Sequence, residues 1–301
     1  MKKHLTILSI LFFINLVQAQ IKKTYYSTGT LEAEGSLVNG KKNGEWKTYF
    51  YSGELKKEGK YINGKKNGEW KIYYKNGKLK QIRKYINNGS NGEWKSYFNN
   101  GQLSRIGNYI NTRRIGEWKT YYPNGVLETI GEYDNDEEIG EWKEYYENGQ
   151  LESEGNYSNG LKDGEWKEYF ENGKLYANYN YINEGETVES TIYYNNGNIS
   201  KLEIYKYGKK EGEWKEYYEN GKIKYIDNYS KNLQNGISKL YYKNGKIEHI
   251  VYFLNSYENG ECKTFYENGN LNSKGNFLKA KKVGKWIFYK KNGEKKSEKK
   301  Y

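Results

Sequence analysis

Apolar and charged residues alternate in this chain over short stretches, and each stretch ends at a glycine-containing phrase. In residues 140–163, GEWKEYYENGQLESEGNYSNGLKD, positions two apart sort into an aromatic side and a charged side. Alternation with a period of two predicts β-strands. No stretch after residue 19 shows the period of a helix, so we expect an all-β chain.

The pattern repeats with a fixed period of 24 residues, marked by a column of tryptophans, the Trp column. Its members are Trp46, Trp70, Trp94, Trp118, Trp142, Trp166, Trp214 and Trp286. The slots between the last three hold Ser190, Ser238 and Cys262. A fixed period of this length indicates an array of repeats in which each unit contacts mainly its neighbours.

Asn148-Gly149 predicts a two-residue type I′ turn, since both residues tolerate a positive φ. Such a turn pairs Tyr146 with Leu151, Glu144 with Ser153 and Trp142 with Gly155. Paired residues share a face of the sheet. We therefore expect one face to carry Trp142, Tyr146, Leu151, Gly155 and Tyr157, and the other to carry Lys143, Tyr145, Glu147, Gln150, Glu152 and Glu154.

The pairing of each tryptophan with a glycine on the following strand predicts that the ring covers that glycine's backbone. It recurs as Trp46/Gly59, Trp94/Gly107 and Trp118/Gly131, with exceptions at Trp70/Arg83, Trp166/Tyr179 and Trp214/Asp227. A looser link at residues 157–166 joins one hairpin to the next. The fold expected is an elongated, single-sheet antiparallel meander of about eleven stacked β-hairpin repeats, on the order of 110 Å long.

The first residues have the pattern of a secretory signal. Lys2 and Lys3 precede an apolar stretch from Leu5 to Val17, and Val17-Gln18-Ala19 offers a cleavage site. An uncleaved anchor is the alternative, but the stretch is shorter than the roughly 20 residues of a spanning helix. We expect a signal peptide at 1–19, a repeat array at 20–301, and export to the periplasm, cell surface or exterior.

Composition argues against several classes of function. The net charge is +12, and +10 without Lys2 and Lys3, but lysine and glutamate are interleaved rather than segregated. This mixture is typical of a solvated face and argues against nucleic-acid binding. Cys262 is the only cysteine and His249 the only histidine after residue 19. No metal spacing, catalytic constellation or cofactor motif is recognisable, so we expect a non-enzymatic protein.

Two local features leave alternatives open. Cys262 occupies a tryptophan slot, where a half-buried apolar residue and a reactive thiol are both conceivable. Residues 134–138, Asp-Asn-Asp-Glu-Glu, form the one acidic cluster, and carboxylates of this kind bind calcium in other settings. Residues 176–211 depart from the consensus at Ser190, as a specialised contact or as simple drift of one unit.

The phrase from Tyr61 to Trp70, Tyr-Ile-Asn-Gly-Lys-Lys-Asn-Gly-Glu-Trp, resembles the MORN repeat. The 24-residue form Trp-Lys-x-Tyr-Tyr-x-Asn-Gly-x-Leu-x-x-x-Gly resembles its bacterial variant, over about residues 23–301. The resemblance implies a hairpin ladder used for protein contact, in some members for membrane contact, and proteins with this variant are often described as antitoxin-like. The signal and the three slots without tryptophan depart from that pattern.

A second aromatic column faces the charged side, and we call it the Tyr column. It comprises Tyr49, Tyr73, Tyr97, Tyr121, Tyr145 and Tyr169. Because every hairpin must bury something, we expect the Trp column to be structural and the Tyr column to bind. The function expected is a scaffold that binds a protein, or a surface polymer or membrane surface. The alternative is an antitoxin or immunity-like protein.

Overall fold

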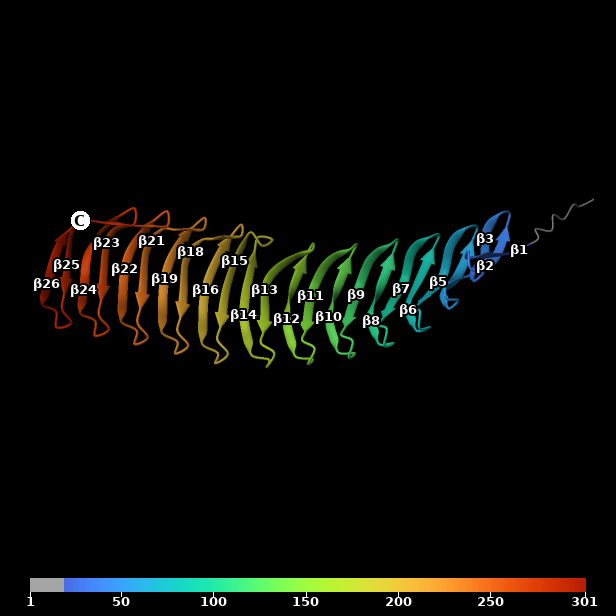
Figure 1. Cartoon of the computed structure of the whole chain (residues 1–301), viewed down its shortest axis with the longest axis horizontal. Coiled ribbons are helices and arrows are strands. Elements are labelled where there is room, and N and C mark those ends of the chain that lie inside the picture. The colour runs from blue at the N-terminus through green and yellow to red at the C-terminus, as the bar shows by residue number, and fades with distance from the viewer. Residues whose placement is uncertain (1–18) are drawn as a thin grey trace, which may run out of the picture. The chain divides into compact units, whose positions relative to one another are not determined.

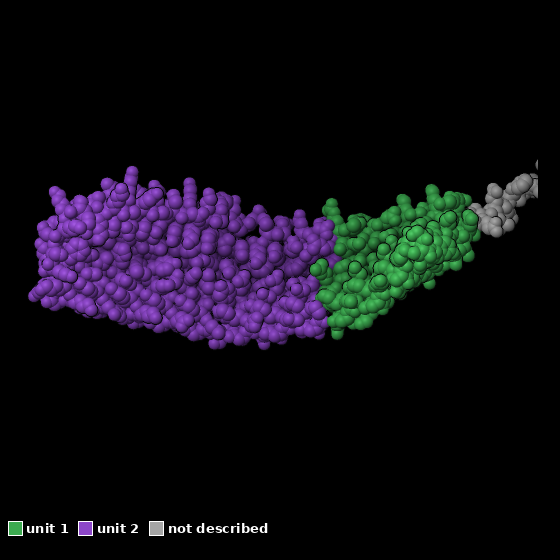
Figure 2. Space-filling model, in the orientation of Figure 1, with its two compact units in different colours: residues 1–113 green, residues 114–301 purple. Residues whose placement is uncertain are grey.

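The structure of this chain is a computed structural model that describes residues 19–301. The predicted signal peptide lies at residues 1–19 and thus falls outside the described residues apart from Ala19. The chain divides into two compact units, residues 1–113 and residues 114–301 (Figure 2).

Unit 1 contains eight strands and part of a ninth. Their bounds are β1 Gln20–Tyr25, β2 Leu31–Val38, β3 Lys41–Tyr49, β4 Leu55–Ile62, β5 Lys65–Tyr73, β6 Leu79–Ile86, β7 Gly89–Tyr97, β8 Leu103–Ile110 and the start of β9 Arg113–Tyr121.

Unit 2 continues with the rest of β9 and the remaining strands. Their bounds are β10 Leu127–Asp134, β11 Glu137–Tyr145, β12 Leu151–Ser158, β13 Leu161–Tyr169, β14 Leu175–Ile182, β15 Thr187–Tyr193, β16 Ile199–Lys206, β17 Lys209–Lys210, β18 Gly212–Tyr217, β19 Ile223–Ser230, β20 Leu233–Gln234, β21 Gly236–Tyr241, β22 Ile247–Leu254, β23 Tyr257–Phe265, β24 Leu271–Leu278, β25 Lys281–Tyr289 and β26 Lys295–Lys300.

Within each unit the strands follow one another in chain order, and neighbours pair antiparallel (Figure 1). Residues 19–301 contain no helix, and hence no helix long and apolar enough to cross a membrane. The prediction of an all-β antiparallel meander of hairpin repeats is confirmed.

The turn at Asn148-Gly149 is not the predicted type I′ turn. Gly149 has a φ of 84°, whereas Asn148 is not among the residues with positive φ. The amide of Gly149 donates to the carbonyl of Tyr146, and the amide of Tyr146 donates to that of Gln150. This is a three-residue loop, a type I turn closed by a left-handed glycine, with a bulge in the strand that follows.

The type I′ turns lie instead at the other ends of the hairpins. Asn159 and Gly160 both have positive φ, 50° and 76°, and they alone separate the paired residues Ser158 and Leu161. The link at residues 157–166, predicted to be looser, therefore contains the tighter turn. Both phrases contain Asn-Gly, so the dipeptide alone does not distinguish them.

The bulge changes which residues share a face. Trp142 pairs with Gly155 and Glu144 with Ser153, as predicted, but Leu151 pairs with Tyr145 rather than Tyr146. Leu151 therefore lies on the charged face, whereas the predicted turn placed Leu151 on the aromatic face and Glu152 on the charged face. The unpaired Glu152 is the bulged residue. Because a bulge interrupts the alternation of side chains, the alternation does not place Glu152 on the charged face.

In five repeats a tryptophan of the core lies over a glycine, but the glycine belongs to the preceding strand, whereas Trp94 lies opposite Arg83 and Trp214 opposite Glu203. A Cβ placed on Gly155 would lie 2.2 Å from the ring of Trp166, and one on Gly59 would lie 2.4 Å from Trp70. The predicted cover of Gly155 by Trp142 is thus wrong, although the two residues do pair. The indole leans back across β12 because a bulge in β13 leaves a carbonyl of β12 within its reach.

That bulge is formed by Gly164 and Glu165, which have no partners on β12 between the pairs Gly155–Trp166 and Asn156–Asp163. The Nε1 of Trp166 donates to the carbonyl of Asn156 at 2.8 Å. The same bond to the residue ten positions earlier is made by four other tryptophans, Trp46, Trp70, Trp214 and Trp286.

The preceding-strand rule accounts for the slots that lack tryptophan. Their partners on the preceding strand are Tyr179 for Ser190, Asp227 for Ser238 and Val251 for Cys262, and none is a glycine. Ser238 donates to Asp227 at 2.6 Å, and Cys262 is buried with Val251. At Ser238 and Cys262 the lost Trp–Gly pair is thus replaced by a hydrogen-bonded or a packed pair, whereas Ser190 lines a hollow of about 490 Å³.

Candidate binding surface

Two faces of the sheet present side chains, and we name them after their columns. On the Trp face, tryptophan and tyrosine rings alternate edge to face: Tyr157 lies 5.7 Å from Trp142 and 5.0 Å from Trp166. Seven of the eight tryptophans are buried, and Trp94, whose preceding-strand partner is Arg83, is half-buried. Edge-to-face pairs of this kind stabilise by about 0.5–1.5 kcal/mol each beyond burial.

The Tyr face is the opposite, charged face. Lys47 pairs across strands with Glu58, at 3.9 Å between Nζ and Oε2, and the six side chains of the Tyr column are all half-buried. Ion pairs at lysines along this face, such as Lys95–Glu93 at 2.7 Å, neutralise both signs of charge. The Tyr column therefore stands among paired charges.

Half of the Tyr column is tied into that network by its hydroxyl groups. Tyr49 donates to Glu34 at 2.7 Å, Tyr73 to Glu58 at 2.6 Å and Tyr169 to Glu154 at 2.7 Å. Burial, and then the hydrogen bond to the carboxylate, raises the pKa of each of these three tyrosines to about 12. These hydroxyls are engaged within the sheet.

The other half of the column has a different neighbour. Fifteen residues before Tyr97, Tyr121 and Tyr145, the place of the glutamate is taken by isoleucine, at Ile82, Ile106 and Ile130. Within residues 19–301, no side chain accepts a hydrogen bond from these three hydroxyls. They retain an unused donor beside an apolar residue, the combination that favours tyrosine in binding surfaces.

Tyr145 borders a hollow of about 430 Å³ on the Tyr face of unit 2. Leu127 and Ile130 give it an apolar wall, while Glu117 and Lys143 give it charged groups. Leu127 reaches this face because of the bulge that follows it. This hollow was not recognisable in the sequence, since the two-residue turn places the leucine on the opposite face.

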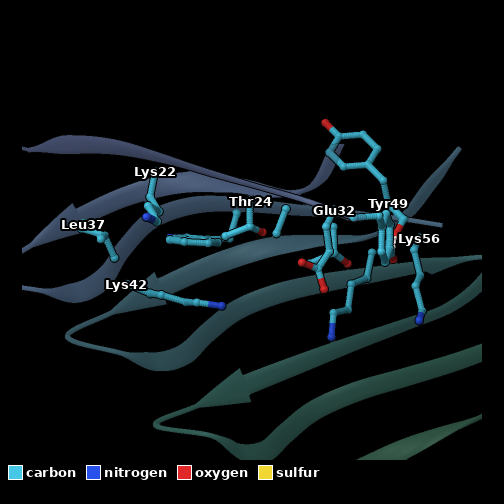
Figure 3. Close-up of a pocket in the computed structure, with 12 residues that line it drawn as sticks. Lys22, Thr24, Glu32, Leu37, Lys42, Tyr49 and Lys56 are labelled. Atoms are coloured by element: carbon cyan, nitrogen blue, oxygen red, sulfur yellow. Dashed lines mark hydrogen bonds between the residues drawn. The ribbon is translucent and has the colours of Figure 1, made fainter. Parts of the chain in front are cut away.

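A second hollow, of about 440 Å³, opens on the Trp face of unit 1 (Figure 3). Four lysines line it together with a single carboxylate, Glu32; they are Lys22, Lys42, Lys56 and Lys57. The ammonium group of Lys42 lies 4.2 Å from the ring centre of Trp46. Aromatic rings and lysine side chains thus lie together on this surface. The sequence did not indicate this cluster of lysines, because lysine and glutamate are interleaved along the chain.

Cys262 and His249 are neighbours, which the sequence did not indicate. The Sγ of Cys262 lies 3.1 Å from the Nε2 of His249, because the two residues are diagonal across β22 and β23. Burial raises the pKa of the thiol to about 11 and lowers the pKa of the imidazole. Both groups are therefore neutral near pH 7, unlike the thiolate of a cysteine nucleophile.

The acidic cluster at residues 134–138 is not assembled into a cation site. Asn135 and Asp136 form a type I′ turn, and Asp136 accepts from the guanidinium of Arg114 at 3.1 Å. Among residues 19–301 there is no group of three or more His, Cys, Asp or Glu side chains placed to hold a metal ion. The structure therefore offers no support for calcium at this cluster.

The fold and its two aromatic faces define a solenoid-like repeat protein built of β-hairpins. The family model described as "MORN repeat variant" matches nine segments, at 42–63, 66–87, 90–111, 114–135, 138–159, 162–183, 210–231, 234–255 and 258–279. The chain belongs to this family. The matches leave out the repeat that contains Ser190, where β14 and β15 pair without the usual bulge.

Similar solved structures are parts of much larger chains. They include "Crystal Structure of TcdB2-TccC3-Cdc42" (14% identity, 90% of this chain and 14% of that chain, TM-score 0.19) and "Crystal Structure of TcdB2-TccC3" (12% identity, 93% and 18%, TM-score 0.20). A third is "Structure of Photorhabdus luminescens Tc holotoxin pore, Mutation TccC3-D651A" (13% identity, 89% and 14%, TM-score 0.18). TM-scores this low carry no argument about this chain. No curated protein matches it.

Proposed function

We propose that this chain is an exported, non-enzymatic scaffold that binds a protein partner along its Tyr face. The observation that carries the proposal is the division of the Tyr column. Tyr97, Tyr121 and Tyr145 keep a free hydroxyl donor beside an apolar position, whereas the other three hydroxyls are bound to glutamates within the sheet.

A protein partner suits this surface better than a polymer of uniform charge. The lysines and glutamates of the Tyr face neutralise one another, as in Lys143–Glu141 at 3.1 Å. The hollow at Tyr145 combines apolar walls with a polar rim, the arrangement found at the centre and edge of protein interfaces. Tyrosine on a rigid strand provides contact area at low entropic cost.

The test is a comparison of captured proteins. The array is immobilised and exposed to envelope extract of the source cells, and the triple variant Tyr97→Ser, Tyr121→Ser, Tyr145→Ser is treated in parallel. We expect proteins enriched on the wild-type array to fall by about tenfold or more on the variant, since truncating buried tyrosines at an interface costs at least about 2 kcal/mol.

A matched variant removes three tyrosines outside the column, Tyr25→Ser, Tyr51→Ser and Tyr257→Ser, all of which are exposed. It should capture the same proteins as the wild type. Equal capture by the column variant and by this control would contradict the proposal. The antitoxin alternative stays a prediction that no contact in the structure favours.

A further inference from the structure

The bulged residue that follows the first residue of the second strand of each hairpin, usually a leucine, recurs with the period of the array, and its charge differs between repeats. In unit 1 these residues are Glu32, Lys56, Lys80 and Ser104, whereas in the first two repeats of unit 2 they are Glu128 and Glu152. The bulge turns these side chains to the Trp face: Lys56 lies 5.5 Å from the ring centre of Phe50, and Lys80 lies 5.4 Å from that of Tyr74.

The lysines of unit 1 belong to a wider cluster of cations, which we call the basic patch. Its members on the Trp face are Lys42, Lys56, Lys57, Lys66, Lys80 and Arg83. None of them forms an ion pair with any residue in the described part of the chain. Burial, and then the charges of Lys66 and Lys56, lowers the pKa of Lys57, so these cations repel one another.

An acidic patch lies on the Trp face of unit 2, around the bulged positions that are equivalent to Lys56 and Lys80. Ser153 of β12 pairs with Glu144 of β11 on one side and with Glu168 of β13 on the other. Glu128 and Glu152 are the bulged residues near this row. None of the four forms an ion pair within residues 19–301. Burial, and then Glu144, Glu168 and Glu128, raises the pKa of Glu152.

Elsewhere on the sheet, many opposite charges that share a face form ion pairs. On the Trp face of β18 and β19, the ammonium of Lys224 lies 2.6 Å from the carboxylate of Glu216. On the Tyr face, the ammonium of Lys119 lies 2.6 Å from the carboxylate of Glu117. The basic patch, beside which Glu32 is the one carboxylate of the hollow, and the acidic patch are two clusters of opposite sign within which no ion pair forms among the described residues.

We propose that the basic patch of one copy of this chain docks on the acidic patch of a second copy. Both patches lie on the Trp face, and their bulged residues, Lys56 and Lys80 in one and Glu128 and Glu152 in the other, are each 24 residues apart, so these charges have matching spacing. A polyanion would neutralise only the basic patch and would leave the glutamates without a partner. A second copy satisfies both, and self-association of this kind uses the face opposite the Tyr column.

The experiment is sedimentation equilibrium of the full chain at low salt and at about 1 M salt, where the Debye length falls to about 3 Å. We expect a dimer or larger assembly at low salt and dissociation at high salt. The variant Lys56→Glu, Lys80→Glu and the variant Glu128→Lys, Glu152→Lys should each associate with themselves at least about tenfold more weakly, because like charges would then face each other.

The decisive measurement mixes the two variants. The patch of unit 1 is acidic in the first variant and the patch of unit 2 is basic in the second, so the two patches attract each other in the mixture. Their mixture should associate more tightly than either variant alone. The control Lys60→Glu, Lys84→Glu makes the same change of charge on the Tyr face of unit 1 and should leave association unchanged. A wild-type chain that stays monomeric at low salt, or a mixture that fails to associate, overturns the proposal.

A further arm measures binding of inorganic polyphosphate to the wild-type chain. Polyphosphate binding without self-association would assign the basic patch to an anionic polymer and contradict docking between copies. Because the column variant of the Tyr face retains both patches, loss of partner capture and loss of self-association are separate results. Each proposal can therefore fail alone.

Discussion

At the scale of single residues, five repeats contain a tryptophan packed on a glycine of the preceding strand. The indole of Trp166 lies flat on Gly155, and its Nε1 reaches the carbonyl beyond it. Any side chain on the glycine would occupy the ring's place. This requirement explains why the glycine disappears wherever the tryptophan does, at Tyr179, Asp227 and Val251.

The first prediction concerns Gly155→Ala. The added methyl group would lie 2.2 Å from Trp166, so the ring must move out of its rotamer and lose its hydrogen bond. We expect a loss of about 1–3 kcal/mol in the free energy of unfolding, the usual cost of overpacking. Guanidinium titration followed by tryptophan fluorescence measures it.

Gly89→Ala is the matched control, since its φ is not positive and the nearest atom to the new methyl is the carbonyl oxygen of Ile86 at 3.4 Å. This variant should change the stability by less than about 0.5 kcal/mol. Equal losses at Gly89 and Gly155 would show that the ring contact is not what requires glycine.

At the scale of the hairpin, two turns with the same dipeptide have different conformations. Asn148 uses its side chain: Oδ1 accepts from the amide of Gln150 at 2.8 Å, and Nδ2 donates to the carbonyl of Glu171 in the next repeat at 3.2 Å. Asn159 makes no such bonds and is present because it tolerates a positive φ. The two asparagines therefore respond differently to substitution.

The second prediction compares Asn148→Gly with Asn159→Gly. Both changes add the same backbone freedom, but only the first removes two hydrogen bonds. We expect Asn148→Gly to lower the free energy of unfolding by about 1 kcal/mol for each bond lost, and Asn159→Gly to cost clearly less. Equal effects in urea titrations would contradict the assignment of the two turns.

The sequence was sufficient for the strands and their order, because period and alternation determine these. The pairing of Trp142 with Gly155, predicted from a two-residue turn, was also correct, because the three-residue loop and its bulge together give the same register. The sequence was not sufficient for the turn type, since Asn-Gly fits both turns. That single ambiguity placed Leu151 and Glu152 on the wrong faces. As a result, neither the apolar wall at Tyr145 nor the acidic patch could be predicted from the sequence.

The covering of Gly155 by Trp166 rather than Trp142 could not be predicted for another reason. Each tryptophan has a neighbour on both sides, and pairing alone does not say to which side the ring leans. The bulge at Gly164 and Glu165 decides it. One signal was available in the sequence: at the three slots without tryptophan, the facing residue of the preceding strand is not a glycine.

At the scale of the whole molecule, repeats are joined by bonds that recur with the period of the array. The hydroxyl of Tyr122 donates to the carbonyl of Tyr145, and that of Tyr146 donates to the carbonyl of Tyr169. Asn124 reaches Glu147 as Asn148 reaches Glu171. These links span 23 residues and recur in most repeats, although Phe50, Phe98 and Phe170 replace the tyrosine and cannot donate.

The last prediction follows from this nearest-neighbour design, in which stability is a sum over repeats and interfaces. Deletion of residues 142–165 joins Glu141 to Trp166 and removes one full period, so every remaining link finds an equivalent partner: Tyr122, for example, then meets Tyr169. We expect this variant to keep its β-sheet circular dichroism and to unfold cooperatively with a smaller dependence on denaturant, because it exposes less surface.

Deletion of residues 154–165 removes half a period and joins Ser153 to Trp166. The tryptophan then lies on a strand whose predecessor offers no glycine and no free carbonyl, and the links of 23 residues lose their acceptors on one side of the junction. We expect lower solubility and loss of the cooperative transition. If this shorter deletion were as stable as the deletion of a full period, the phase of the array would not govern its folding.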